Sequence, residues 1–214
     1  RKVTFQAHRM DKVAVVAHAL QSSGRGRTII FARTKRAAAQ LADDLARRGF
    51  HVGAVHGDLG QKSREKSLHA FRTGQVDILV ATDIAARGID IADVSLVVHV
   101  DPPAEHKAYL HRAGRTARGG AAGTVITLVM DEQRKEVDAL IKKAGVTATE
   151  HDISHRDNPA GAPILKEITG ARKPNGPALP PPGQDSPQKP AKSVKKSNSQ
   201  RRRSGGKVAR RRRR

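Results

Sequence analysis

The chain has 214 residues, with 41 Lys/Arg against 20 Asp/Glu and no cysteine. The lack of cysteine excludes disulfides, cysteine-ligated zinc and thiol catalysis, and no apolar run approaches the roughly 18 residues of a membrane span. The length predicts one domain plus additional chain, or two small domains. The chain begins at Arg1 and shows no signal peptide, so we expect a fragment or a processed chain. A cysteine-free composition fits a reducing compartment, and we expect a cytoplasmic location.

Residues 1–158 alternate between helix and strand patterns. In chain order, the expected elements are a helix at 11–20, a strand at 28–32, a helix at 35–48, a strand at 52–55, a helix at 61–72, strands at 77–81 and 94–100, a helix from 104 onward, a strand at 123–130, a helix at 132–144 and an edge strand at 146–153. Thr34 is suited to cap the second helix, and the glycines at 49, 74 and 145 are suited to end helices.

The expected strands are short, continuous apolar runs rather than alternating patterns. Such runs are typical of strands that are buried on both faces, with helices as the cover. The sequence therefore predicts an open, mostly parallel α/β sheet with helices on both faces. Ligands of such sheets lie beyond the carboxyl ends of the strands.

The C-terminal segment, residues 159–214, differs from the rest of the chain. It holds 16 Lys/Arg against two acidic residues, so it contributes +14 of the net charge of +21. It is rich in Pro, Ser and Gly and lacks apolar periodicity, so we expect a disordered basic tail. Such a tail binds polyanions through counterion release without sequence choice, and it has no aromatic side chains for base stacking. A purely solubilising role is the alternative.

Polar loops follow the expected strands, and they would meet at one edge of the sheet. Gln61 and Arg64 lie three residues apart at the start of a helix, whose N-terminus offers backbone N–H groups to an anion. Thr82 and Gly88 offer a hydroxyl and an exposed backbone, which suit contacts to phosphate or sugar.

Two carboxylates, Asp83 and Asp90, lie in this basic neighbourhood. Asp83 can accept hydrogen bonds from ribose hydroxyls, or it can simply pair with Arg87. We assign Asp90 mostly to structure.

The sequence HRAGRTAR at residues 111–118 concentrates three arginines and a histidine in eight residues. If the helix from 104 continues, His111, Arg115 and Arg118 share one face, where like charges repel each other. A guanidinium matches phosphate oxygens geometrically, so a phosphate opposite this face is one interpretation. A solvated basic helix face is the other.

Four segments resemble, in order and spacing, the second RecA-like domain of DEAD-box RNA helicases. They are TIIFART at 28–34, the segment His56-Gly57-Asp58 with Gln61 and Arg64, ATDIAARGID at 81–90, and HRAGRTAR at 111–118. The resemblance covers about residues 1–155. The histidine that begins the last motif favours DEAD-box proteins over related DNA helicases.

The resemblance implies a role for each matching residue. Arg115 and Arg118 would be arginine fingers on the ATP γ-phosphate, where such residues stabilise the phosphoryl group in transfer, and Asp83 would contact the ATP ribose. His111 and Arg112 would contact the first domain. Contacts to phosphate and 2′-OH groups would make RNA binding independent of base sequence. The residues implied in RNA binding are Thr34, Gly57, Gln61, Arg64, Thr82 and Gly88.

Two residues depart from the family pattern, since Ala113 replaces a larger aliphatic residue and Ala117 replaces a glycine. We expect a packing change at the first and no backbone consequence at the second, because a helix needs no positive φ. The chain also lacks a G-x-x-x-x-G-K-[ST] loop and an Asp-Glu-Ala-Asp sequence. In the family these motifs lie on the first domain, so we expect ATP and Mg²⁺ to be held mainly there and this chain alone to lack ATPase activity.

Three functional hypotheses follow. The first is the C-terminal motor domain of an ATP-dependent RNA helicase, and the second is an RNA-binding module with the tail as its main effector. Deletion of residues 159–214 separates them, because a motor would bind RNA more weakly and with a flatter salt dependence, yet keep ATP-dependent unwinding at saturating RNA. The third is a DNA helicase of the wider superfamily, which ATPase stimulation by RNA and DNA of equal length would distinguish.

Overall fold

The structure, a computed structural model, describes residues 2–6, 12–21, 25–89, 91, 94–118 and 122–152. The expected tail at 159–214 and Asp90 lie outside the described residues. The strands are β1 (Lys2–Gln6), β2 (Arg27–Phe31), β3 (Val52–Val55), β4 (Ile78–Ala81), β5 (Val94–His99), β6 (Thr124–Val129) and β7 (Thr149–Asp152). The helices are α1 (Lys12–Leu20), α2 (Lys35–Arg47), α3 (Gln61–Thr73), α4 (Asp83–Ala86), α5 (His106–Ala113) and α6 (Arg134–Lys143), the last preceded by a 3₁₀ turn (Asp131–Gln133).

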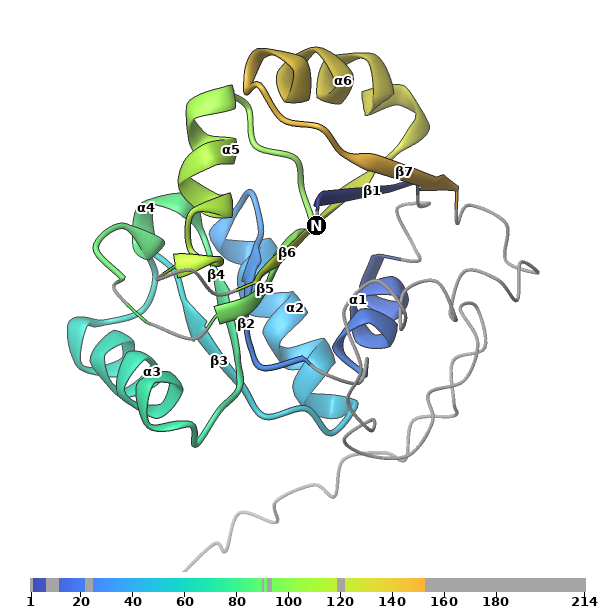
Figure 1. Cartoon of the computed structure of the whole chain (residues 1–214). Helices are drawn as coiled ribbons and strands as arrows, with labels where there is room; N and C mark the ends of the chain where they lie inside the picture. Colours follow the sequence, from blue (N-terminus) through green and yellow to red (C-terminus); the bar gives the residue numbers. More distant parts are fainter. Residues whose placement is uncertain are drawn as a thin grey trace, which may run out of the picture.

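The strands form one sheet in the order β3-β4-β2-β5-β6-β1-β7, and every pairing between these described strands is parallel (Figure 1). This confirms the predicted α/β fold, including the edge strand near residue 150. No helix in the described part of the chain is long and apolar enough to cross a membrane.

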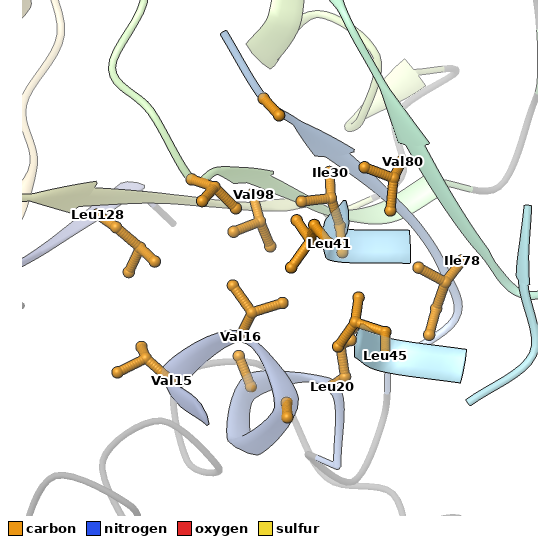
Figure 2. Packing of buried hydrophobic residues seen from close by; sticks show 14 of the residues in the cluster. Val15, Val16, Leu20, Ile30, Leu41, Leu45, Ile78, Val80, Val98 and Leu128 are labelled. Carbon is orange, nitrogen blue, oxygen red and sulfur yellow. The ribbon is translucent and has the colours of Figure 1, made fainter. Parts of the chain in front are cut away.

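Both faces of the sheet are covered by helices, as continuous apolar strands predict. Alternate side chains of a strand point to opposite faces, so Ile30 packs in a cluster with α1 and α2, whereas Ile29 packs in a cluster with α3 and α4. Figure 2 shows the first cluster, in which Val16 of α1 and Leu41 of α2 approach the strands. A third cluster joins Tyr109 of α5 to α6.

The helix boundaries follow the predicted capping residues. The Thr34 hydroxyl accepts a hydrogen bond from the Ala37 amide at 3.1 Å and caps α2. Gly74 ends α3 with a φ of 77°, a backbone conformation that glycine adopts without strain.

Two elements of the structure, β1 and α4, are not among those expected from the sequence. The strand β1 has the sequence KVTFQ, which alternates polar and apolar residues, yet it lies inside the sheet between β6 and β7. Alternation is typical of a half-buried strand, whereas the strands expected from the sequence are continuous apolar runs. The helix α4 has four residues, too few to display a helical period.

The prediction that one helix carries the whole arginine segment is wrong. The helix α5 ends at Ala113, with Gly114 as its C-cap. The amides of Arg115 and Thr116 each bond to a carbonyl three residues back, at 3.1 Å, which tightens the chain into turns. The Thr116 hydroxyl donates to the carbonyl of Val94 and holds these turns against β5. The cationic side chains that the prediction placed on one helix face are therefore spread over a helix end and the turns after it.

Candidate functional site

The strands β3, β4, β2 and β5 are consecutive neighbours in the sheet, and all are parallel. The polar loops that follow them therefore meet at one edge, as predicted. An exposed ion pair, Lys35 Nζ to Asp58 Oδ1 at 2.7 Å, links the start of α2 to the loop after β3. The site is built on this edge.

Arg112 occupies the centre of the edge and is only 3% exposed. Its Nε and Nη2 atoms donate to the two carboxylate oxygens of Asp83 at 2.6 and 2.7 Å, and its Nη1 donates to the Asp101 carbonyl at 2.8 Å. The guanidinium also lies over the Phe31 ring, 5.1 Å from its centroid. The alternative pairing of Asp83 with Arg87 is wrong, because Arg112 is the partner. The interdomain contact expected of Arg112 stays a prediction, since every contact described here lies within the domain.

His99 packs against the Phe31 ring, over which the Arg112 guanidinium lies. It is fully buried, with Nδ1 3.1 Å from the Thr127 hydroxyl, and its ring makes edge-to-face contacts with Phe31 and Tyr109. Burial, and then the positive charge of Arg112, hold the pKa of His99 well below its usual value. His99 is therefore neutral at physiological pH and adds no further positive charge beneath the guanidinium.

A pocket of about 340 Å³ lies beside the Asp83–Arg112 ion pair. Its lining includes Asp83, His111, Arg112 and Arg115, so the structure brings together most of the side chains implied in ATP and interdomain contacts. Arg115 Nη1 donates to the Ile89 carbonyl at 2.6 Å, which anchors the turns after α5 to the loop after α4.

Arg118 is placed differently from Arg115. Its side chain is exposed, and its Nε donates to the Gly114 carbonyl at 2.9 Å. The pocket lining does not include it. The two arginines implied as fingers therefore do not converge within this domain.

The residues implied in RNA binding lie over β2, β3 and β4. Arg64 of α3 donates from Nη2 to the Ala85 carbonyl of α4 at 3.1 Å. The Thr82 amide donates to the Val55 carbonyl at 3.3 Å, so the end of β3 is joined to the residue that follows β4. Gln61 is exposed, and its amide donates to Glu65 at 2.7 Å.

Two glycines leave room beside these side chains. A Cβ atom built on Gly57 or on Gly88 would meet no atom within 4 Å, so another backbone can approach closely at both positions. Gly88 also has a φ of 75°. Together with the hydroxyls of Thr34 and Thr82, this edge offers small donors, open backbone and the guanidinium of Arg64 to a polyanion.

The comparisons with known proteins show the family to which the chain belongs. Residues 11–120 match the family model described as the helicase conserved C-terminal domain. The ATP-dependent RNA helicase DRS1 of Mycosarcoma maydis is 44% identical over 126 residues, which are 59% of this chain and 14% of that protein. The solved C-terminal domain of the DEAD-box protein Dbp5 is 30% identical, with a TM-score of 0.70, over 78% of this chain and 97% of that one. The chain belongs to the DEAD-box RNA helicases and contains their C-terminal domain.

A further neighbour of this DEAD-box domain is Dbp5 of S. cerevisiae bound to RNA and ADP BeF3. It is 31% identical, with a TM-score of 0.69, over 79% of this chain and 45% of that one. The chain spans less than half of these curated relatives, 14% of DRS1 and 42% of the RNA helicase RhlB of a Shewanella species.

Ala117 of this DEAD-box domain corrects a second expectation. Its φ is 57°, in the left-handed region, because the chain turns after α5 instead of continuing as a helix. A Cβ atom in that region costs about 1–2 kcal/mol, which a glycine would avoid. Gly123 packs so closely against Thr116 that a Cβ there would overlap it, so the residue before β6 lies directly against these turns. The substitution by alanine therefore does have a backbone consequence.

We expect Ala117→Gly to raise the free energy of unfolding by about 0.5–1 kcal/mol. The strain relieved is partly offset by the larger conformational freedom of glycine in the unfolded chain. Urea unfolding of the chain measures the change. Ala104→Gly is the matched control at an exposed loop position without positive φ, and it should lower stability or leave it unchanged. An equal loss in both variants would contradict strain at Ala117.

Sequence reasoning missed three contributors to this DEAD-box site: Phe31 under the guanidinium, His99 beneath the ring, and Asp101 at the end of β5. Phe31 and His99 lie inside apolar strand runs and looked like core. Asp101 directly precedes Pro102-Pro103 beyond a strand end, where the ligands of such sheets bind, and this position is the sequence signal for it.

Proposed function

We propose that the chain is the C-terminal motor domain of an ATP-dependent RNA helicase. In this proposal it binds the RNA backbone and supplies arginine fingers for the ATP hydrolysis that drives local unwinding and remodelling of RNA duplexes. The observation that carries the proposal is the pocket at the carboxyl edge, where His111 and Arg115 stand beside the Asp83–Arg112 pair. A cationic pocket beside a partly exposed carboxylate suits a nucleotide, with phosphate at one end and ribose at the other.

Arg115 is the first candidate finger. Its side chain is partly exposed in the pocket, and a guanidinium has five donors in a fixed plane, so phosphate oxygens can join the Ile89 carbonyl as acceptors. Arg118 would be a second finger that meets the phosphate once the first domain closes over this edge. Such residues stabilise charge that spreads over the transferred phosphoryl group.

Asp83 is the candidate for the ribose. Its side chain is 43% exposed although it binds Arg112, and an ionised carboxylate has about four acceptor positions. Two of them serve Arg112, which leaves capacity for sugar hydroxyls. His111 is exposed on the last turn of α5 and would contact the first domain, with Arg112.

RNA would lie along the other half of the edge, over β3, β4 and β2. Open backbone at Gly57 and Gly88 lets a phosphate approach, and the hydroxyls of Thr34 and Thr82 are suited to phosphate or 2′-OH contacts. Arg64 would add charge, with Gln61 supporting it. Residues 159–214 would add affinity without sequence choice.

ATP and Mg²⁺ would be held mainly by the first domain, which carries the phosphate-binding loop and the Asp-Glu-Ala-Asp motif in the family. The chain alone should therefore show no ATP turnover above background when RNA is added. The full-length protein under the same conditions should hydrolyse ATP and separate short RNA duplexes. A phosphate-release assay measures both. RNA-stimulated turnover by the purified 214-residue chain would contradict the proposal.

A further inference from the structure

A buried lysine connects α1 to the site. The side chain of Lys12 is 10% exposed, and its Nζ donates to the Val100 carbonyl at 2.8 Å and to Asp101 Oδ1 at 3.0 Å. These partners lie 88 and 89 residues further along the chain. Burial of an ammonium is unfavourable unless it is paired and hydrogen-bonded. None of the roles assigned so far involves this lysine.

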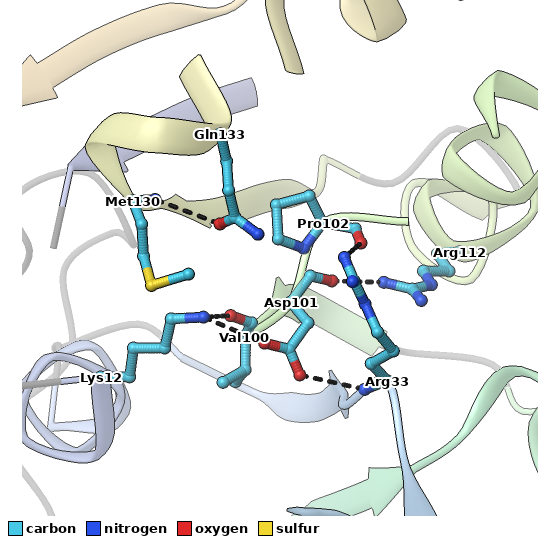
Figure 3. A network of polar contacts seen from close by, with 8 residues as sticks. All are labelled: Lys12, Arg33, Val100, Asp101, Pro102, Arg112, Met130 and Gln133. Carbon is cyan, nitrogen blue, oxygen red and sulfur yellow. Dashed lines mark hydrogen bonds and ion pairs between the residues drawn. The ribbon is translucent and has the colours of Figure 1, made fainter. Parts of the chain in front are cut away.

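Asp101 is held on several sides (Figure 3). One carboxylate oxygen accepts from Lys12, and the other accepts from the Arg33 amide at 3.1 Å. Its backbone carbonyl accepts from Arg112 Nη1 at 2.8 Å. Burial by itself raises the pKa of Asp101, but the Arg33 amide, the Lys12 hydrogen bond and the charges of both cations together hold it below its usual value. The carboxylate is therefore ionised whenever the site works.

The Asp101 carbonyl is one of the groups that fix the guanidinium of Arg112. That guanidinium in turn fixes Asp83, and the α5 helix that bears it leads directly into Arg115. A continuous set of contacts thus runs from α1 through the end of β5 to the arginine segment. We propose that Lys12 is a positioning residue for the arginine fingers, which acts through Asp101. This inference rests on the proposed function, because Lys12 acts only on the position of the arginines to which that function gives a role.

The other end of α1 offers a matched control. Arg25 has a side chain that is 3% exposed, and it donates to the Leu20 carbonyl at 2.7 Å and to Asp77. It therefore joins α1 to the sheet through a buried cation, as Lys12 does. It does so before β2, at the amino edge, away from the pocket. Loss of either cation should destabilise the fold, but only loss of Lys12 should disturb the fingers.

The test uses the full-length helicase with Lys12→Met, Arg25→Met and the wild type, at a temperature where all three are folded by circular dichroism. For Lys12→Met we expect kcat for ATP at saturating RNA to fall by about tenfold or more, since misplacement by about 1 Å can lower a rate 100-fold. The KM for RNA should stay within about twofold, because Gln61 and Arg64 lie outside this set of contacts, whereas the KM for ATP is expected to rise with the displacement of Asp83. Arg25→Met should keep the wild-type kcat.

A double variant adds a second readout. If Lys12 acts through Asp101, the variant Lys12→Met/Asp101→Asn should have the same kcat as Asp101→Asn alone. If Lys12→Met does not fold, Lys12→Gln replaces it, because an amide can still donate to Val100. The inference is overturned if Lys12→Met or Lys12→Gln keeps the wild-type kcat, or if Arg25→Met lowers kcat as much. It is also overturned if the losses in kcat of Lys12→Met and Asp101→Asn multiply in the double variant.

Failure of this inference is separable from failure of the proposed function. Arg115→Ala in the same protein reports on the finger itself. A normal kcat in Arg115→Ala would remove the proposed function, whereas a low kcat there with a normal kcat in Lys12→Met would remove only the positioning role.

Discussion

Arg115→Ala should lower ATP turnover of the full-length helicase by orders of magnitude while the fold is retained. An arginine that stabilises the transferred phosphoryl group is worth about 10³–10⁵ in rate in related phosphoryl-transfer enzymes. The position of Arg115 in the pocket with Asp83 and Arg112 supports this role. Steady-state ATPase assays at saturating ATP and RNA measure the loss, and unfolding curves check the fold.

Two further variants sharpen the result. Arg115→Lys keeps the charge but lacks the planar fork, so it should recover only part of the activity. Lys107→Ala removes an exposed cation from α5, the helix that precedes Arg115, and it should leave turnover within about twofold. A loss below about tenfold in Arg115→Ala would mean that Arg115 is not a finger.

Arg112→Ala should have the largest effect on stability, a loss of about 3 kcal/mol in the free energy of unfolding. Removal of one partner from a buried ion pair typically costs about 3–5 kcal/mol. The lower end applies because Asp83 is 43% exposed and can recover water, although the Asp101 carbonyl and the Phe31 ring also lose their partner. Urea unfolding of the chain measures the change.

Arg87→Ala is the control for this loss, because Arg87 is the other candidate partner of Asp83 and is exposed. Its removal should change stability by less than about 0.5 kcal/mol. If both variants lose the same amount, the Asp83–Arg112 pair does not hold this edge together.

Local patterns were sufficient for most of the fold. The apolar run at 28–31 becomes a strand buried on both faces, and Thr34 caps the helix after it, because both depend on neighbouring residues only. The strand β1 depends instead on backbone pairing with β6 and β7, which lie more than 110 residues away. No local pattern reports such a pairing.

The same distinction between local and tertiary features applies to the candidate site. The motifs identified His111, Arg112, Arg115 and Asp83 as one functional group, and the pocket brings them together. They did not reveal which arginine binds Asp83, because Arg87 is closer in sequence than Arg112. Partner choice depends on burial over Phe31 and on the Asp101 carbonyl, and both are tertiary features.

The sequence by itself determined the class of fold, the edge of the sheet that carries the site, and the family, since each depends on residue types at fixed spacings. The tertiary structure alone decided the shape of the arginine segment. Its sequence allows a longer helix, but the Thr116 hydroxyl bonds to β5 and Gly123 packs against it, so the chain turns after Ala113 and Ala117 adopts a positive φ. A hydrogen bond to a strand 22 residues earlier outweighs the local preference for helix.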